Sequence, residues 1–368
     1  MQTFDEHLRS PHVSIEDHIR TVRIRLGELL TQRRAIYLDT RFWILLRDAA
    51  AGRGTVAAEE LLRLLRDGVA RGLLFCPISE TTFFEIIKQR DSTSRRATAR
   101  LVDELSLGAT LIGQQERIAI EISHLFHDCI GRMDLHPLSH LVWSKLNFVI
   151  GEYYPANTAF DRVTETALQK AFFDHLSTRP LMNLIDHIES KPHPEENLSQ
   201  LINDLDDGIA GNVQHLRSFA QAYKMEVRGL SSLVGGMALD AVALFARRED
   251  IMIGRSKGND LTPAKQYEDL IAAGLMQGTA RKTLGTMNVL ATLHASLRWN
   301  KGRKIKSNDL PDFDHAAAAL VYCDAFFTER SLATMITQRH VALDLFYDCF
   351  VTDDPDQAVS WTSAHVSA

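Results

Sequence analysis

Hydrophobic and polar positions follow two different periods in the first third of the chain. Apolar residues recur at helical spacing over Ser14 to Arg34 and over Glu59 to Gly72, with Ser14 placed as a helix cap and Gly72 as a helix end. Between such helices lie short unbroken apolar runs, which are typical of buried parallel strands. These runs are Ala35 to Leu38, Leu73 to Ile78 and Ala109 to Ile112. The alternation predicts parallel βαβ units, which bind ligands beyond the carboxyl ends of their strands.

From about Gln115 to Leu297 the strand pattern stops and helical periodicity takes over. Prolines and Gly258 mark breaks between the helical segments. The expected helices are Glu116 to Cys129, Leu141 to Tyr153, Thr164 to Leu176, Asn197 to Tyr223, Leu230 to Ala246, Pro263 to Met276 and Ala280 to Leu297. Beyond this region, Ala325 to Thr328 and Asp348 to Thr352 have the apolar pattern of two further strands.

The pattern therefore predicts an α/β fold in which a parallel sheet flanked by helices is built from both ends of the chain. The predicted boundaries place an N-terminal helix in residues 1–34 and the sheet domain in residues 35–129 and 305–368. A large all-helical insertion would occupy residues 130–304.

Composition changes this picture little. The 368 residues have the apolar and charged fractions of a soluble globular protein. A net charge of −6 argues against a mainly electrostatic nucleic-acid binder, although it leaves room for a local basic groove. The four cysteines have no CxxC spacing, the N-terminus is polar, and no apolar run reaches the length of a membrane span. We therefore expect a cytoplasmic protein with reduced thiols and no membrane contact.

Acidic residues stand at the ends of several predicted strands. Asp39 directly follows the first apolar run, and Glu85 lies on a helix after the second. Asp312 precedes a short alanine-rich helix, and Asp324 and Glu329 flank the apolar run that follows it. A doubly wound sheet can bring such residues together near one face. Clustered carboxylates are the ligands that Mg²⁺ and Mn²⁺ prefer, and these ions activate water for the hydrolysis of a phosphodiester.

Several of these acids also have a purely structural interpretation. Asp39 is placed to cap the helix that follows it. Glu85 suits a solvated helix face, and Glu80 competes with it as a ligand. Asp312 and Asp314 both fall in a first helical turn, where acids complement the helix dipole. Of these two we favour Asp312 as the site residue.

Three stretches of the chain resemble the PIN-domain nuclease superfamily, namely Ile36 to Thr40, Pro77 to Glu85 and Asn308 through Glu329. The resemblance implies a parallel-sheet PIN fold and a metal-dependent nuclease that usually acts on RNA. By position, Asp39 matches the first family acid, Glu85 the second and Asp312 the third. Asp324 and Glu329 compete for the fourth place. These acids would then hold one or two Mg²⁺ or Mn²⁺ ions, and the helical middle of the chain lies outside the match.

Basic residues stand close to these acids. Arg41 and Arg330 depart from the family pattern, which has a small polar residue and an acid at these places. An arginine there would either bind the scissile phosphate or neutralise the acidic cluster. A basic run with Trp299 precedes the last acidic stretch, and it suits phosphate contact with a stacked base as well as a solvated loop. The run comprises Arg298, Lys301, Arg303, Lys304 and Lys306.

Histidines suggest further candidates. A group around Cys129 has the residue types of a zinc site, although its spacing matches no familiar motif. The group comprises His124, His127, Asp128, His136 and His140. Arg117 with His124 resembles the Arg-and-His pair of HEPN-type ribonucleases, which act without metal. His315 shares a helical face with Asp312, which suits contact with substrate or metal but equally suits packing or exposure to water, so we assign it no role in the site.

The sequence therefore predicts a Mg²⁺- or Mn²⁺-dependent endonuclease with RNA as its substrate. The resemblance further implies a toxin or a defence effector, because small PIN proteins are frequently toxins. The insertion would select the substrate or bind a partner such as an inhibitor protein, and a homodimer is a further expectation. The alternative is a non-catalytic PIN-like module that binds RNA or protein, with Arg41 and Arg330 having taken over the site. The target sequence and the choice between RNA and DNA are left open by the sequence.

Overall fold

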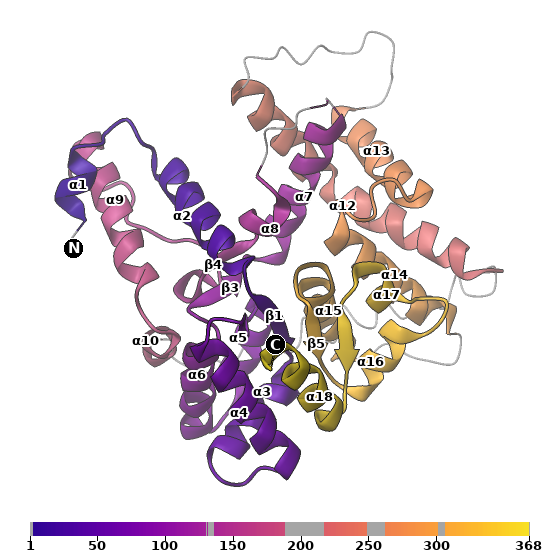
Figure 1. The fold of residues 1–368 in the computed structure, drawn as a ribbon. Coiled ribbons are helices and arrows are strands. Elements are labelled where there is room, and N and C mark those ends of the chain that lie inside the picture. The colour runs from indigo at the N-terminus through magenta and orange to yellow at the C-terminus, as the bar shows by residue number, and fades with distance from the viewer. Residues whose placement is uncertain are drawn as a thin grey trace.

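The structure is a computed structural model that describes residues 3–129, 131, 136–187, 217–248, 262–300 and 306–367, with the backbone alone for 241–248. It is an α/β protein in which many helices surround a small parallel sheet (Figure 1). The helices before the middle of the chain are α1 (Phe4–Leu8), α2 (Ile15–Leu30), α3 (Thr40–Ala50), α4 (Val56–Ala70), α5 (Glu80–Lys88), α6 (Ser92–Leu105), α7 (Gln114–Cys129), α8 (Leu138–Leu141), η1 (Leu146–Phe148), α9 (Arg162–Ser177) and α10 (Leu181–His187). The later helices are α12 (Phe219–Arg248), α13 (Pro263–Gln277), α14 (Gly285–Trp299), α15 (Asp309–Tyr322), α16 (Arg330–Thr337), α17 (Leu343–Tyr347) and α18 (Pro355–Val366).

The central sheet of the described residues has four parallel strands in the order β2-β1-β5-β6. The strands are β1 (Arg34–Leu38), β2 (Leu74–Phe75), β5 (Ala325–Phe327) and β6 (Phe350–Thr352). β1 pairs with β2 on one side and with β5 on the other, where Ile36 lies opposite Ala325. The two middle strands thus come from opposite ends of the chain, as the sequence predicts.

The third predicted strand lies outside the central sheet. β3 (Ala109–Leu111) forms a parallel bridge from Thr110 to Ile78, which follows the end of β2. It pairs antiparallel with β4 (Trp143–Lys145), which lies inside the segment Leu141 to Tyr153. The helix predicted for that segment is wrong. The segment contains a short run of aromatic and branched residues. The apolar pattern of this run fits a buried helix and a buried strand equally well.

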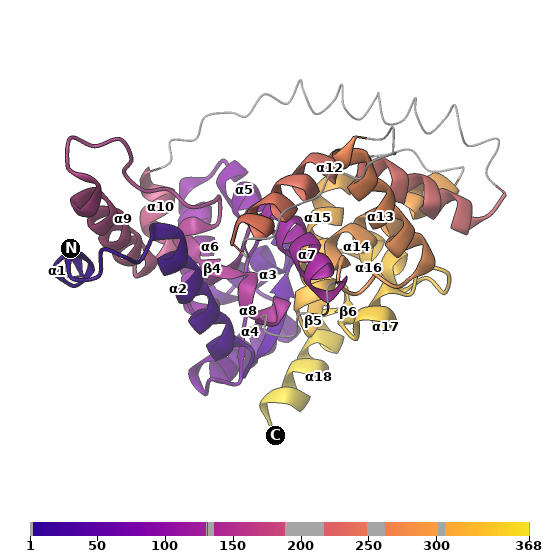
Figure 2. The same ribbon diagram turned by 90° about the horizontal axis from the view of Figure 1, so that it is seen from above.

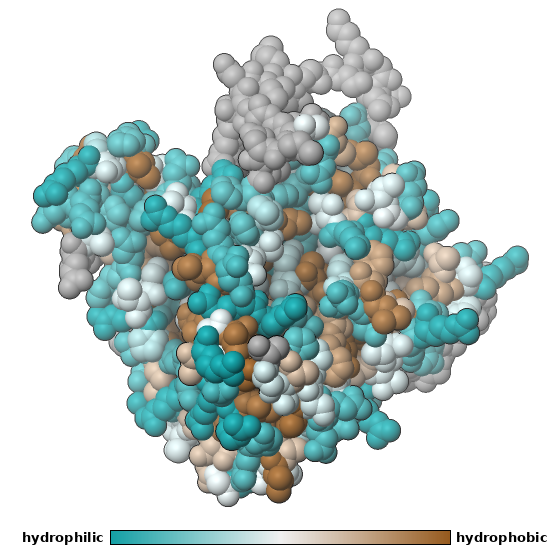
Figure 3. Space-filling view, viewed as in Figure 1, coloured by the Kyte–Doolittle hydropathy of each residue, from teal (hydrophilic) through white to brown (hydrophobic). Residues whose placement is uncertain are grey.

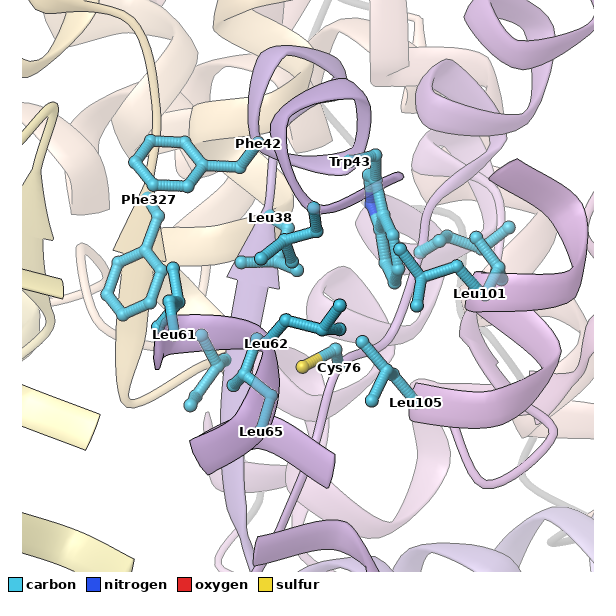
Figure 4. Close-up of a cluster of buried hydrophobic side chains, with 14 of the residues drawn as sticks. Leu38, Phe42, Trp43, Leu61, Leu62, Leu65, Cys76, Leu101, Leu105 and Phe327 are labelled. Carbon is cyan, nitrogen blue, oxygen red and sulfur yellow. The ribbon is translucent and has the colours of Figure 1, made fainter. Parts of the chain in front are cut away.

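Alternate residues of β1 face opposite sides of the sheet, where two hydrophobic clusters lie. Ala35 and Tyr37 belong to a cluster with residues of α2, α14, α15 and α16. Ile36 and Leu38 belong to the other cluster, with residues of α3, α4, α6 and α18. Figure 4 shows leucines of α4 and α6 gathered around Leu38 and Cys76 in this second cluster. Both faces of β1 are buried from Ala35 to Leu38, which agrees with the unbroken apolar run of these residues.

The helices of the middle pack as a bundle that shares its core with the sheet. α12, α13 and α7 gather against α14 on one side of the molecule (Figure 2). α14 is buried along most of its length, since Met287 and Ala291 face the bundle while Val289 and Leu293 belong to a sheet cluster. α14 therefore connects the bundle to the strands that carry the predicted acids.

An arm formed by α1, α2 and α9 stands to one side of the body in Figures 1 and 2. α2 begins at its predicted cap, where the Asp17 N–H donates to the Ser14 hydroxyl at 3.1 Å. Ile15 and Ile19 on the inner face of α2 pack against Phe173 of α9. The amphipathic pattern of α2 thus serves packing within the chain.

Other sequence predictions have mixed outcomes. Cys76, Cys323 and Cys349 are buried free thiols, while Cys129 is exposed. Most of the predicted helix Asn197 to Tyr223 lies outside the described residues. Within the part of the chain that the structure describes, no helix has the length and apolar character needed to cross a membrane.

Candidate active site at the carboxyl edge of the sheet

Asp39 directly follows β1 and caps α3. Its Oδ1 accepts a hydrogen bond from the Phe42 N–H at 3.0 Å, as the capping interpretation predicts. Only 5% of the residue is exposed. Burial raises the pKa of the Asp39 carboxyl to about 6, although His315 and the Phe42 N–H act in the opposite direction. Asp39 is therefore both a helix cap and a buried carboxyl at the end of a central strand.

Glu85 lies on α5, beside the same edge of the sheet. Its Oε2 accepts hydrogen bonds from the Thr40 hydroxyl and from His315 Nε2, the latter at 3.1 Å. Burial would raise the pKa of Glu85, but the contacts with His315 and Thr40 outweigh burial and lower it. Because Thr40 directly follows Asp39 in the sequence, this contact holds the Glu85 carboxylate near the end of β1.

His315 joins these groups, although sequence reasoning gave it no assigned role. Its Nδ1 lies 2.8 Å from the Tyr37 hydroxyl, its Nε2 lies 3.1 Å from Glu85, and the residue is only 2% exposed. The Tyr37 hydroxyl lies 2.6 Å from the hydroxyl of Ser79, the residue before α5. Burial would lower the pKa of His315, but Tyr37 and Glu85 raise it well above its ordinary value. A buried imidazole whose charged form is favoured by its neighbours thus lies within the acidic site.

Asp312 lies in the first turn of α15. The pKa of its carboxyl is raised to about 7, first by burial and then by the negative charge of Glu329. Asp39 and Asp309 act in the same direction, and His315 opposes them. Carboxylates from the ends of β1 and β5 and from α15 therefore interact electrostatically at one edge, despite their separation in the sequence.

The structure separates the two residues that competed for the fourth place. Glu329 follows β5 and precedes α16, and its charge acts on Asp312. Asp324 precedes β5, and at that opposite edge it accepts hydrogen bonds from Arg34 at 2.5 Å and from the Ala35 N–H at 2.8 Å. The structure does not bring Asp324 to the other acids, because the length of β5 lies between them. The assignment of Asp324 as a metal ligand and catalytic residue is corrected accordingly.

Asp314 and Glu80 are the alternatives to Asp312 and Glu85 in the sequence analysis. Both interact with residues of α7. Glu80 Oε1 accepts a hydrogen bond from the Gln114 N–H at 2.8 Å, where α7 begins. The pKa of Asp314 is raised to about 6 by burial, while the charge of Arg117 lowers it and that of Glu80 raises it. These two acids therefore belong to a polar contact between α5, α7 and α15.

The predicted nucleic-acid-binding arginines have partners within the protein. Arg41 donates to the main-chain carbonyls of Thr328 at 3.1 Å and of Asp353 at 3.0 Å. It therefore ties the ends of β5 and β6 to α3. Arg298 forms an ion pair with Glu226, and its side chain is mostly buried. This pair joins α14 to α12, which does not fit the predicted nucleic-acid surface. Outside the described residues lie Lys301, Arg303 and Lys304.

The donor atoms of the carboxyl edge are carboxylate oxygens, the donors that Mg²⁺ and Mn²⁺ take. Among the described residues, the groups of three whose ligand atoms come within 4.8 Å of one another lie elsewhere. These groups are His7, His18 and Asp174, and Glu28, His136 and His140. An ion at the carboxyl edge would therefore be held by one or two carboxylates and would complete its shell with water, which suits Mg²⁺.

The zinc and HEPN interpretations of the helical middle find little support. His136 and His140 come together with Glu28 of α2 rather than with the other histidines of the predicted group. The Arg117 guanidinium donates to the Ile112 carbonyl at 2.6 Å, and the residue is 1% exposed. An arginine enclosed in this way cannot reach a nucleic-acid backbone without moving.

Five residues thus come together at the carboxyl ends of β1 and β5, and we call them the carboxyl-edge site. They are Asp39, Glu85, Asp312, His315 and Glu329. Comparison with known proteins adds no further constraint, because no family model, no curated protein and no solved structure matches the chain.

Proposed function

We propose that the carboxyl-edge site binds Mg²⁺ or Mn²⁺ and that the chain is a metal-dependent nuclease with a PIN-like fold and RNA as its substrate. The observation that carries this proposal is the convergence of acids at one edge of the sheet, where Asp39 follows β1, Glu329 follows β5 and Glu85 contacts Thr40 and His315. Burial, and then the charges of Glu329 and Asp39, raise the pKa of Asp312 to about 7. A bound cation would relieve this repulsion. The parallel sheet supports the same proposal, because strands from both chain ends bring their carboxyl ends to one edge.

The residues of the site divide into two roles. Asp39, Asp312 and Glu329 offer carboxylates, one or two of which would hold the ion directly, and the cap on α3 fixes the position of the Asp39 carboxyl. His315 keeps Glu85 ionised and oriented through the 3.1 Å contact. When bound, a divalent ion supplies an activated water and neutralises charge that develops on a phosphodiester. Protons compete for Asp39 and Asp312, whose pKa values are about 6 and 7, so ion binding weakens at acidic pH.

The second candidate is a non-catalytic module that binds RNA or protein at this edge. The ligand geometry favours it, because within the described residues the acids of the site do not form a group of three ligands within 4.8 Å. Arg330 is exposed directly after Glu329, and Arg41 lies at the ends of β5 and β6. These two arginines offer positive charge to a phosphate without any hydrolysis.

Cleavage of labelled single-stranded RNA in Mn²⁺, with and without a chelator, separates the two candidates. Asp39→Asn is the informative variant, because asparagine also caps helices well but carries no charge. We expect the wild type to cut RNA, and the chelator and the variant to abolish cutting. Equal cutting by both proteins, or no cutting of any RNA or DNA, would overturn the nuclease proposal. RNA binding that survives without cutting would favour the module.

A matched control comes from another capping aspartate. Asp161 caps α9 by accepting hydrogen bonds from the Val163 and Thr164 N–H groups, and it lies on the exposed surface. Asp161→Asn makes the same chemical change at a helix start outside the site. It should leave RNA cleavage unchanged. If Asp39→Asn and Asp161→Asn lowered RNA cleavage equally, the effect would come from helix capping rather than from the site.

A further inference from the structure

A second cluster of ligating side chains lies in the arm, apart from the carboxyl-edge site. His7 Nε2 and His18 Nε2 each lie 2.7 Å from a different oxygen of Asp174. The centroids of the two imidazole rings are 4.7 Å apart, and the ligand atoms of all three residues lie within 4.8 Å of one another. The side chains are between 13% and 23% exposed, so the cluster is sheltered but open to solvent.

Three helices supply these side chains, and a buried lysine fixes how the helices meet. His7 comes from α1, His18 from α2 and Asp174 from α9. Lys170, one turn before Asp174, donates to the main-chain carbonyls of Ser10 and Val13, both at 3.0 Å. These bonds hold the connection between α1 and α2 against α9. The ligand atoms are therefore brought together by contacts that do not depend on a metal.

α1 packs along α9 without burying any of its residues completely. It is five residues long and has no buried residue. A helix this short is not stable by itself. In Figure 3 the surface over α1 and α9 is mostly hydrophilic. The polar cluster is therefore a main contact of α1 with the rest of the arm.

We propose that His7, His18 and Asp174 bind a divalent transition-metal ion of the Zn²⁺ type, which fastens α1 to α2 and α9. Two imidazole nitrogens and one carboxylate oxygen form a donor set that Zn²⁺ takes readily, whereas Mg²⁺ prefers oxygen ligands alone. Three protein ligands leave one tetrahedral position for water.

The orientation of the side chains also suits a metal. His7 Nε2 and His18 Nε2 both face the Asp174 carboxylate, each beside a different oxygen. An ion would take the place of the imidazole protons that point at this carboxylate.

Titration of the metal-free full-length chain with Zn²⁺ tests the proposal. We expect one Zn²⁺ per chain by calorimetry against a competing chelator, and no comparable binding of Mg²⁺. His18→Ala and His7→Ala should each weaken Zn²⁺ binding by about 100-fold or more, because ligand losses exceed the usual effects of outer-shell changes. Unchanged far-ultraviolet circular dichroism would show that the variants remain folded.

Two control variants make the result specific. His12 is an exposed histidine between α1 and α2, and His12→Ala should leave the bound Zn²⁺ in place. The double change His136→Ala and His140→Ala removes the other candidate group and should do the same. The proposal is overturned if the wild type binds no Zn²⁺, if His18→Ala binds it equally well, or if only the double change removes it. The cluster would then be held by hydrogen bonds alone.

Hydrogen exchange of residues 3–10 tests the fastening itself. Zn²⁺ should slow exchange in this segment by about tenfold or more in the wild type and not in His18→Ala, because binding to the folded arm suppresses its local opening. Zn²⁺ that binds without slowing exchange would refute the fastening role.

Discussion

The central sheet has aspartates both at the carboxyl ends of its strands, which form the carboxyl edge, and at their amino ends, which form the amino edge. The electrostatic settings of these aspartates are opposite. At the carboxyl edge, burial and neighbouring acids raise the pKa of Asp39 to about 6 and that of Asp312 to about 7. At the amino edge, Asp324 accepts hydrogen bonds from Arg34 and from the Ala35 N–H, beside a cavity of about 670 Å³. The amino edge resembles an ordinary structural contact. The carboxyl edge holds acids close together at a cost in stability, as functional sites often do.

The largest expected difference between the edges is in activity. Glu329→Gln should lower Mn²⁺-dependent RNA cleavage by about 100-fold, because it removes a charge from the carboxyl-edge site. Asp324→Asn should leave cleavage within about twofold of the wild type, because the whole of β5 separates it from the site. Initial rates on one labelled RNA measure both effects. A larger loss in Asp324→Asn than in Glu329→Gln would reverse our assignment of the fourth acid.

The next largest effect is expected on stability, at His315. His315→Ala should lower the free energy of unfolding by about 3 kcal/mol, because it leaves the Glu85 carboxylate without its buried cationic partner. It also removes a partner of the Tyr37 hydroxyl. Urea denaturation at neutral pH measures the change. The exposed His12→Ala serves as the control and should change stability little. A cost below about 1 kcal/mol for His315→Ala would show that the imidazolium does not organise the site.

A smaller effect should appear in the pH dependence of stability. The pKa of Asp312 is raised from 3.8 to about 7 in the folded chain, so ionisation of this carboxyl favours unfolding. The wild type should therefore lose stability as pH rises from about 4 to about 7. Asp312→Asn should remove this loss and be more stable than the wild type by about 1–2 kcal/mol at pH 8, after solvent screening of a half-buried group.

Urea denaturation at about pH 4.5 and pH 8 in the presence of a chelator measures this dependence. The two proteins should differ little at the lower pH. Addition of Mg²⁺ at pH 8 should reduce the advantage of the variant, since the ion stabilises the wild type. A variant that is less stable than the wild type at pH 8 without metal would contradict the repulsion between the acids.

The smallest effect is expected at the amino edge. Asp324→Ala should cost about 1 kcal/mol, because it removes a hydrogen bond to the Ala35 N–H and a largely exposed ion pair. Arg34→Ala should cost less than about 0.5 kcal/mol, since only the exposed pair is lost. Neither change should alter the response of stability to Mg²⁺. A Mg²⁺ response that disappears in Asp324→Ala would place an ion at the amino edge.

The sheet was predictable because its strands are local signals. β1 and β5 are short apolar runs, and the place of Asp39 at the end of β1 follows from the sequence alone. The sequence did not show whether Asp324 or Glu329 joins the site, because both residues flank β5. Choosing between them requires the direction of β5 relative to β1, which depends on pairing between distant segments.

His315 and β4 show a second limit of sequence reasoning. The role of His315 depends on Tyr37 from β1 and Glu85 from α5, and neither is near it in the sequence. Its only local signal is its spacing from Asp312 on one helical face. β4 was missed because its pairing with β3 selects a strand where the apolar run permits a helix. In both cases tertiary contacts decide between local alternatives.

The pairing of β1 with β5 has a consequence for synthesis of the protein. Ala35 and Asp324, which meet where these strands begin, are 289 residues apart in the sequence. During translation β1 leaves the ribosome long before its central partner exists, so its exposed edge must wait for almost the whole chain. Glu329 arrives with that partner. A nascent or truncated chain that ends before β5 therefore lacks both a complete sheet and a complete site, and the proposed nuclease activity can begin only after synthesis has passed this strand.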